Sequence, residues 1–253
     1  MNGNTTRDGV GRHFHQFVKL MAVMLSLSIG ISSSAAEDAV QTGAAKTFAD
    51  RKENAVRLTV TRKIRDRDRT SEVQALVIDE QGIIVTSLDG IESVGSGLQE
   101  MLQRRGGGNA DKGELTRVAM IRSDGSETEG EVVLTDPDLD LAFIKVTLPE
   151  DEDAAKLASA PAVAARPLLL DEAVAISRMD AGFQYEATAA MVQIAAVLEI
   201  PRVLYVPAGG TGDKGVGVFN LKGECLGITA QIHNKLLIVP METILKLAGT
   251  ISQ

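Results

Sequence analysis

The sequence predicts an all-β protein that folds in two halves behind a cleaved leader. Short segments that alternate apolar and polar residues recur along residues 55–148 and again along residues 171–253, with Gly and Asp turns between them. This regular spacing is typical of closed antiparallel barrels or of a sandwich. An acidic and then Ala- and Pro-rich linker, residues 149–170, separates the two halves. Aromatic residues are scarce, so the core has to be built from Val, Ile, Leu and Ala.

The first 36 residues have the order of a secretory signal peptide. A basic stretch, "RHFHQFVK", precedes an apolar run of 12 residues, "LMAVMLSLSIGI", and small residues at Ser34 and Ala36 fit cleavage after residue 36. A transmembrane anchor is the alternative interpretation, but the run is shorter than the ~20 residues that a spanning helix needs. We therefore expect a secreted or periplasmic protein with no stable membrane anchor after cleavage.

The first half begins with a polar, Ala-rich segment, residues 37–54, which we expect to be a flexible lead-in or a short helix. Alternation with period two then predicts strands, and Gly or Asp residues mark the turns between them. The predicted elements are a strand at 55–64, a charged turn at 65–72, a hairpin at 73–87 around "DEQG", a short helix at 98–105, a flexible loop at 106–113, a hairpin at 116–136 around "SDGS", and a doubly buried strand at 139–148.

The second half repeats this style. Its predicted strand segments are "EAVAISRM", "YEATAAMVQIAAVL", "PRVLYVPA", "GVGVFNL", "GECLGITAQI" and "KLLIVP". The ending "METILKLAGTI" has apolar residues at helical spacing, which predicts a C-terminal helix that packs on this half.

Charge and cysteine usage exclude several classes of function. The chain carries a net charge of −8, and removal of the leader makes it −10, which argues against nucleic acid as a partner. The single cysteine, Cys225, allows no internal disulfide and lies in an apolar strand pattern, so we expect it in the core. One cysteine and few histidines support no zinc site, and we expect no metal and no cofactor.

Four separated segments carry a more specific pattern. They are "ALVIDEQGIIVTSLDGI" (75–91), "IRSDGSETEGEVVLTDPDLDLAFIKV" (121–146), "EAVAISRM" (172–179) and "GDKGVGVFNLKGECLGI" (212–228). In this order they resemble the HtrA/Deg branch of the trypsin-like serine proteases, over nearly all of the predicted mature chain. The resemblance implies two antiparallel six-stranded β-barrels with the catalytic groups in the cleft between them. The family's peptide-binding PDZ module is not expected in this sequence.

The resemblance also assigns the triad positions, and two of them have changed. A hydrolytic triad needs a hydroxyl nucleophile, an imidazole base and a carboxylate that orients the base. The carboxylate position matches Asp140, which is retained. The histidine position matches Asp89 in "TSLD", and the serine position matches Lys214 in "GDKGV". We expect a degenerate triad.

No histidine of the sequence fits the missing base. His13 and His15 lie in the predicted leader, and His233 lies in a predicted loop of the second barrel. Ser87 with Lys214 as a base is an alternative, but it needs a neutral lysine, and nearby carboxylates would keep the ammonium charged. Thr211 and Cys225 offer no better nucleophile.

The glycine scaffold of the nucleophile loop persists although the nucleophile does not. Gly212 and Gly215 tolerate backbone angles that residues with a Cβ resist, and Gly212, Asp213, Lys214 and Gly215 form the vestigial oxyanion loop that the resemblance implies. We predict that Lys214 points across the cleft and forms a charge pair with Asp89 and Asp140, the alternative being a lysine that reaches into solvent.

These residues predict a secreted trypsin-fold protein that does not cleave peptides. We expect a pseudoprotease that binds a peptide or protein partner in the cleft between the barrels. Two alternatives stay open, an unconventional serine-type hydrolase of the HtrA/Deg family and a structural scaffold of an envelope assembly.

Overall fold

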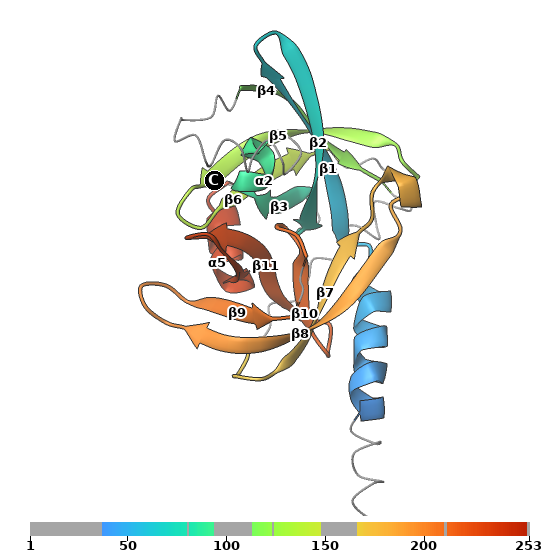
Figure 1. Ribbon diagram of the computed structural model, residues 1–253, viewed down its shortest axis with the longest axis vertical. Helices are drawn as coiled ribbons and strands as arrows, with labels where there is room; N and C mark the ends of the chain where they lie inside the picture. Colours follow the sequence, from blue (N-terminus) through green and yellow to red (C-terminus); the bar gives the residue numbers. More distant parts are fainter. Residues whose placement is uncertain are drawn as a thin grey trace, which may run out of the picture. The chain divides into compact units, whose positions relative to one another are not determined.

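A computed structural model describes residues 37–79, 81–93, 113–122, 124–147, 166–209 and 212–251. Their strands close into two antiparallel barrels of six strands each, followed by a C-terminal helix (Figure 1). The strand order is β1-β2-β3-β6-β5-β4 in the first barrel and β10-β11-β12-β9-β8-β7 in the second. The all-β double barrel expected from the sequence is confirmed. The predicted leader, the helix at 98–105 and most of the linker at 149–170 lie outside the described residues.

The first barrel carries one short helix after its third strand. Its elements are β1 (Ala55–Ile64), β2 (Arg67–Val77), β3 (Ile83–Ser87), α2 (Leu88–Glu92), β4 (Glu114–Ile121), β5 (Glu127–Asp136) and β6 (Leu141–Val146). The tight turn between β2 and β3 has Gly82 at φ 82°, as the sequence predicts, and the Asp79 carboxylate accepts the backbone N–H groups of Gln81 and Ile83.

The second barrel ends in the predicted helix. Its elements are β7 (Glu172–Arg178), the short 3-10 helix η1 (Ala181–Phe183), β8 (Ala187–Leu198), β9 (Leu204–Ala208), β10 (Gly217–Asn220), β11 (Cys225–Ile232), β12 (Lys235–Pro240) and α5 (Met241–Ala248). None of the helices in the described ranges is both long and apolar enough to cross a membrane.

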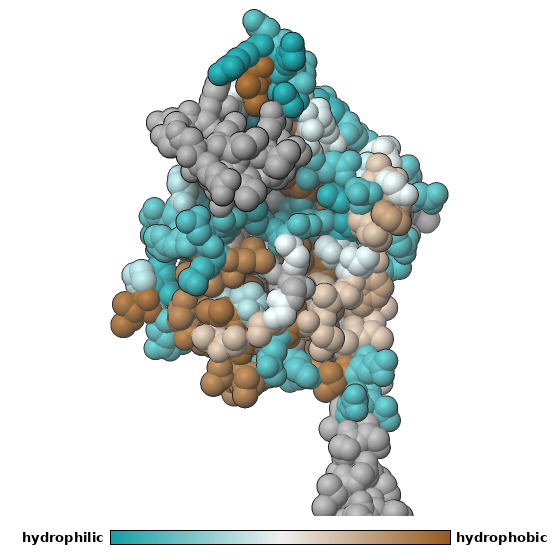
Figure 2. Space-filling view, in the orientation of Figure 1, coloured by the Kyte–Doolittle hydropathy of each residue, from teal (hydrophilic) through white to brown (hydrophobic). Residues whose placement is uncertain are grey.

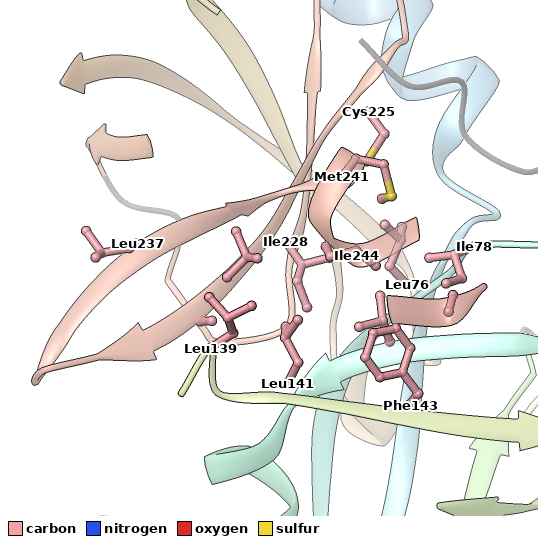
Figure 3. Packing of buried hydrophobic residues seen from close by; sticks show 14 of the residues in the cluster. Leu76, Ile78, Leu139, Leu141, Phe143, Cys225, Ile228, Leu237, Met241 and Ile244 are labelled. Carbon is pink, nitrogen blue, oxygen red and sulfur yellow. The ribbon is translucent and has the colours of Figure 1, made fainter. Parts of the chain in front are cut away.

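One apolar cluster joins the two barrels. Figure 3 shows Leu76 and Phe143 of the first barrel close to Ile228 of the second barrel and Ile244 of α5, and all four side chains are fully buried. Full burial of such a side chain stabilises the fold by about 1.5–3 kcal/mol. The shared core therefore holds the barrels as one body, and the groups at their boundary keep fixed positions.

A polar seam also links the barrels. The Gln74 amide of β2 donates to the Arg178 carbonyl of β7 at 2.7 Å and accepts the Arg178 N–H at 3.0 Å. The buried Arg178 guanidinium in turn donates to the Ala55 carbonyl at 2.6 Å and pairs with Glu53 at 2.7 Å. Because buried polar groups are costly without partners, this bonding fixes the registration of one barrel on the other.

One expectation for the N-terminal part is wrong, and another is decided between its two alternatives. The predicted charged turn at 65–72 is only the pair Arg65–Asp66, with φ 47° and 63°, and residues 67–72 belong to β2. A run of charged residues is typical of a solvated turn. The strands of an exposed hairpin can carry the same charged residues, because they too face solvent. The segment 37–54, which we expect to be a flexible lead-in or a short helix, is helical over residues 37–51.

That helix is fixed to the second barrel by its C-terminal half, which explains why it is not a flexible segment. Ala44 and Phe48 pack against the shared core. Thr47 Oγ1 donates to the Asn220 carbonyl at 3.1 Å, and Arg51 Nε donates to the Gly223 carbonyl at 2.7 Å.

Candidate active-site remnant

The residues that the sequence assigns to the degenerate triad lie where the two barrels meet. Asp89 is in the first turn of α2, Asp140 ends the turn before β6, and Lys214 is in the loop before β10. Both β3 and α2 belong to the first barrel, whereas the Lys214 loop and β11 belong to the second. The fold therefore brings together three groups that are far apart in the sequence.

Asp140 is a buried carboxylate whose oxygens are occupied by donors from both barrels. Oδ2 accepts the Ser87 hydroxyl at 2.6 Å and the Gln231 N–H at 2.7 Å, and Oδ1 accepts the Asp89 N–H at 2.6 Å. Burial raises the pKa of the Asp140 carboxyl above its ordinary value, and the three hydrogen bonds oppose that shift. The carboxylate thus ties β3, α2 and β11 together.

Ser87 is the side-chain hydrogen-bond partner of Asp140. Its hydroxyl donates to Asp140 and also accepts the Gly90 N–H at 3.3 Å, so it caps α2. The Ser87 side chain is fully buried, so a substrate carbonyl cannot reach its oxygen. The sequence indicates this serine only as an alternative nucleophile, and no pattern in it predicts the bond to Asp140.

Lys214 crosses from the second barrel to the first and forms an ion pair with Asp89. The lysine side chain is 25% exposed and the aspartate side chain 36% exposed. The predicted charge pair is present with Asp89, and no ion pair joins the two described residues Lys214 and Asp140. The reason is that both carboxylate oxygens of Asp140 already accept hydrogen bonds, from the Ser87 hydroxyl and from backbone N–H groups.

The loop that carries Lys214 keeps a glycine-dependent path. Gly212 and Gly215 have φ values of 72° and 81°. A Cβ at Gly215 would lie 2.1 Å from the Gln74 carbonyl oxygen of the first barrel, so only glycine fits there. Asp213 lies between these positions, exposed to solvent.

Thr229 of β11 anchors this loop, a role that no local sequence pattern indicates. The buried Thr229 hydroxyl donates to the Asp213 carbonyl at 2.8 Å and accepts the Val216 N–H at 2.9 Å. The Thr229 carbonyl accepts the Gly215 N–H at 2.7 Å. These bonds hold the loop that carries Lys214 in its path.

The other candidate groups lie elsewhere. His233 is exposed in the two-residue turn between β11 and β12, with φ 49°, and no hydrogen bond links its ring to Ser87 or Asp140. Cys225 is buried, and burial raises the pKa of its thiol to about 12, so it is not a thiolate nucleophile. Thr211 lies outside the described residues.

This arrangement offers charge and hydrogen-bond donors but no proton-transfer chain. An ammonium group paired with a carboxylate is a poor nucleophile, and the buried serine hydroxyl has a carboxylate rather than an imidazole as its acceptor. In the part of the chain that the structure describes, no group of three or more His, Cys, Asp or Glu residues is placed to hold a metal ion.

Comparison with known protein families places this region in a described family. The profile of the trypsin-like peptidase domain matches residues 74–228, a span that includes the positions of Asp89, Asp140 and Lys214. No curated protein matches the chain significantly.

Proposed function

Since the chain belongs to the trypsin-like peptidase domain family, we propose that it is a pseudoprotease, a member that binds a peptide or protein partner and does not hydrolyse it. Within the family we assign it to the HtrA/Deg branch, on the four segments in which its sequence resembles that branch. We further propose that the leader directs it out of the cytoplasm.

The ion pair between Lys214 and Asp89 is the observation that carries the proposal. These residues stand at the two positions where a trypsin-like enzyme needs a hydroxyl and an imidazole. The pair satisfies both side chains, so neither is available to attack a carbonyl or to take a proton. Asp140 keeps its family position but serves as a structural link.

An unconventional hydrolase is the main alternative, with Ser87 as its nucleophile. Two observations weigh against it. Ser87 is fully buried, and its proton is directed at Asp140, 2.6 Å away. Lys214 is engaged by Asp89, so it is not a free amine base for that serine.

Binding in the cleft is supported by what the remnant retains. The loop from Gly212 to Gly215 keeps its glycine conformation, and Thr229 fixes it. Lys214 and Asp89 are both partly exposed, so a bound chain has access to one charge of each sign. We therefore place the partner's peptide segment across the Lys214 loop.

Turnover of casein by the purified mature protein tests the catalytic part of this proposal. We expect no turnover above buffer, with an active trypsin-like protease as the positive control. Turnover that disappears in both Lys214→Ala and Ser87→Ala would replace the pseudoprotease with the unconventional hydrolase.

A cleft variant separates binding from a scaffold role. Lys214→Glu reverses the charge beside Asp89. Lys222→Glu makes the same charge change in the exposed turn between β10 and β11. Partners captured from the extracytoplasmic fraction should be lost with Lys214→Glu and kept with Lys222→Glu. Retention of every partner by the cleft variant would favour the envelope scaffold.

A further inference from the structure

The hairpin formed by β1 and β2 carries positive charge on an acidic protein. Residues 62–69, "RKIRDRDR", hold five basic and two acidic residues, whereas the whole chain has a net charge of −8. Residues 65–70 are all exposed. In Figure 1 this hairpin projects from the first barrel, and in Figure 2 its surface is mostly hydrophilic. A local charge opposite to that of the chain points to an interaction with an anionic partner.

Three arginines of this hairpin, Arg65, Arg67 and Arg69, have no counter-ion in the described parts of the chain, and the last two lie in β2. Lys63 lies 3.8 Å from Asp66, and Arg62 is buried and donates to the Gly113 carbonyl at 2.7 Å. Arg67 and Arg69, by contrast, are exposed, and no described acidic side chain pairs with either. Because side chains alternate along a strand, both arginines project from the same face of β2.

In the described parts of the chain, the edge of β2 beside these arginines is open. β1 pairs with β2 from Ala55 to Ile64, but β3 pairs with β2 only at its last three residues, from Ala75 to Val77. Among the described residues, no strand pairs with the outer edge of β2 before Ala75. An open strand edge presents unpaired N–H and C=O groups to which an extended chain can bind.

The turn geometry shows which backbone groups face that open edge. In a two-residue hairpin the residues that flank the turn, here Ile64 and Arg67, form the first hydrogen-bonded pair. Alternate residues of β2 from Arg67 onwards therefore bond to β1. The residues between them direct their N–H and C=O groups outwards, and they are Asp68, Thr70 and Glu72. Gln74 is the next of this series, and its carbonyl indeed accepts the Thr86 hydroxyl from the β3 side at 2.6 Å.

We propose that this edge of β2 binds an extended acidic segment of a partner protein by strand addition. The backbone of Asp68, Thr70 and Glu72 supplies the hydrogen bonds. Arg67 and Arg69 supply the selectivity, because side chains directly across two antiparallel strands lie about 4.5–5.5 Å apart. The recognised segment therefore carries acidic residues at alternate positions, i and i+2, on the face that meets the two arginines. This surface is separate from the loop that carries Lys214, which belongs to the second barrel.

A binding measurement with a synthetic peptide tests the proposal. The probe is a fluorescein-labelled nine-residue peptide in which glutamate alternates with threonine and valine, and its anisotropy is followed as the mature protein is added. We expect saturable binding that weakens at least tenfold in the double variant Arg67→Glu, Arg69→Glu. Lys222→Glu with Lys235→Glu changes the net charge equally at other exposed sites and should leave the affinity within twofold.

Two altered peptides distinguish strand addition from general attraction to negative charge. A peptide of the same composition with its glutamates adjacent, and one N-methylated at alternate backbone amides, should both bind at least tenfold more weakly. Equal binding of either peptide would overturn the proposal, as would equally tight binding of phosphatidylglycerol vesicles that the peptide does not compete away. No binding of the alternating peptide would also overturn it, and would mean that the arginines only protect the edge from aggregation.

Circular dichroism of each variant shows whether a loss of binding reflects unfolding. If the double charge reversal unfolds the protein, the milder Arg67→Gln, Arg69→Gln variant takes its place, and we then expect at least a threefold loss.

Discussion

Replacing Asp140 by asparagine keeps the size of the side chain and removes one acceptor oxygen and the negative charge. In the native protein the two carboxylate oxygens accept the Ser87 hydroxyl and the Asp89 and Gln231 N–H groups. The asparagine can rotate its amide either way. Either orientation sets its NH₂ group against a backbone N–H, either that of Asp89 or that of Gln231.

The magnitude follows from these contacts. A hydrogen bond to a charged group contributes about 1.5–3 kcal/mol, and an unsatisfied buried donor costs about 1–3 kcal/mol. The pKa of Asp140 is raised overall, because desolvation outweighs the hydrogen bonds to the charged carboxylate. Most of the cost of the replacement therefore comes from the backbone N–H group that loses its acceptor. We therefore expect Asp140→Asn to lower the free energy of unfolding by about 2–4 kcal/mol, which lowers Tm by roughly 4–16 °C in a chain of this size.

Urea unfolding followed by circular dichroism measures this difference, because the protein has no tryptophan to report by fluorescence. Ser87→Ala is the comparison variant. It removes one of the three donors to Asp140 and the side-chain cap of α2, but it leaves the Asp89 and Gln231 N–H groups bonded to Asp140. Its cost should be smaller, about 1–2 kcal/mol. A loss below about 0.5 kcal/mol for Asp140→Asn, at an unchanged slope, would show that the carboxylate does not link the barrels as described.

Three further predictions concern the same boundary. A double-mutant cycle with Lys214→Met and Asp89→Asn, followed by urea unfolding, should give a coupling free energy of about 0.5–1 kcal/mol, because the ion pair is partly exposed. A coupling free energy near zero would contradict the ion pair. Gly215→Ala should destabilise by about 3–5 kcal/mol, because its Cβ meets a backbone carbonyl at 2.1 Å. Gly212→Ala should cost only about 1–2 kcal/mol, because its surroundings are open and only its positive φ opposes a Cβ, so equal costs would refute the packing argument. Cys225, with a pKa raised to about 12 by burial, should resist a thiol-specific disulfide reagent at pH 8 and react fully in urea; rapid native labelling would mean that the strand opens.

Period-two alternation and turn residues were enough to predict most of the strands, but they left a barrel and a sandwich both open. The two six-stranded barrels were predicted from the resemblance to the trypsin-like serine proteases, and the structure confirms them. The helix α5 followed from apolar spacing, and Ile244 is fully buried as that spacing requires. Gly82 and Gly215 could also be predicted, because a positive φ at a turn leaves a clear mark in the sequence.

The roles of Ser87, Thr229 and Arg178 could not be predicted in the same way. Each acts through partners that are distant in the sequence, such as Asp140 for Ser87 and the Ala55 carbonyl for Arg178. When a serine or threonine lies within an apolar strand, the neighbouring residues do not indicate which distant group will accept its hydrogen bond. The hairpin strand at 67–72 was missed for a different reason, because its charges match those of a solvated turn.

Intact-mass measurement after treatment with a fluorophosphonate tests the central claim most directly. The reagent adds one phosphonyl group to an activated serine, so a working serine hydrolase gains a single, stoichiometric adduct. We predict no mass increase for the mature protein under conditions in which an active trypsin-like protease is fully labelled. The reasons are that Lys214 and Asp89 form an ion pair with each other and that Ser87 is buried. A stoichiometric adduct that maps to Ser87 and is lost in Ser87→Ala would contradict the account.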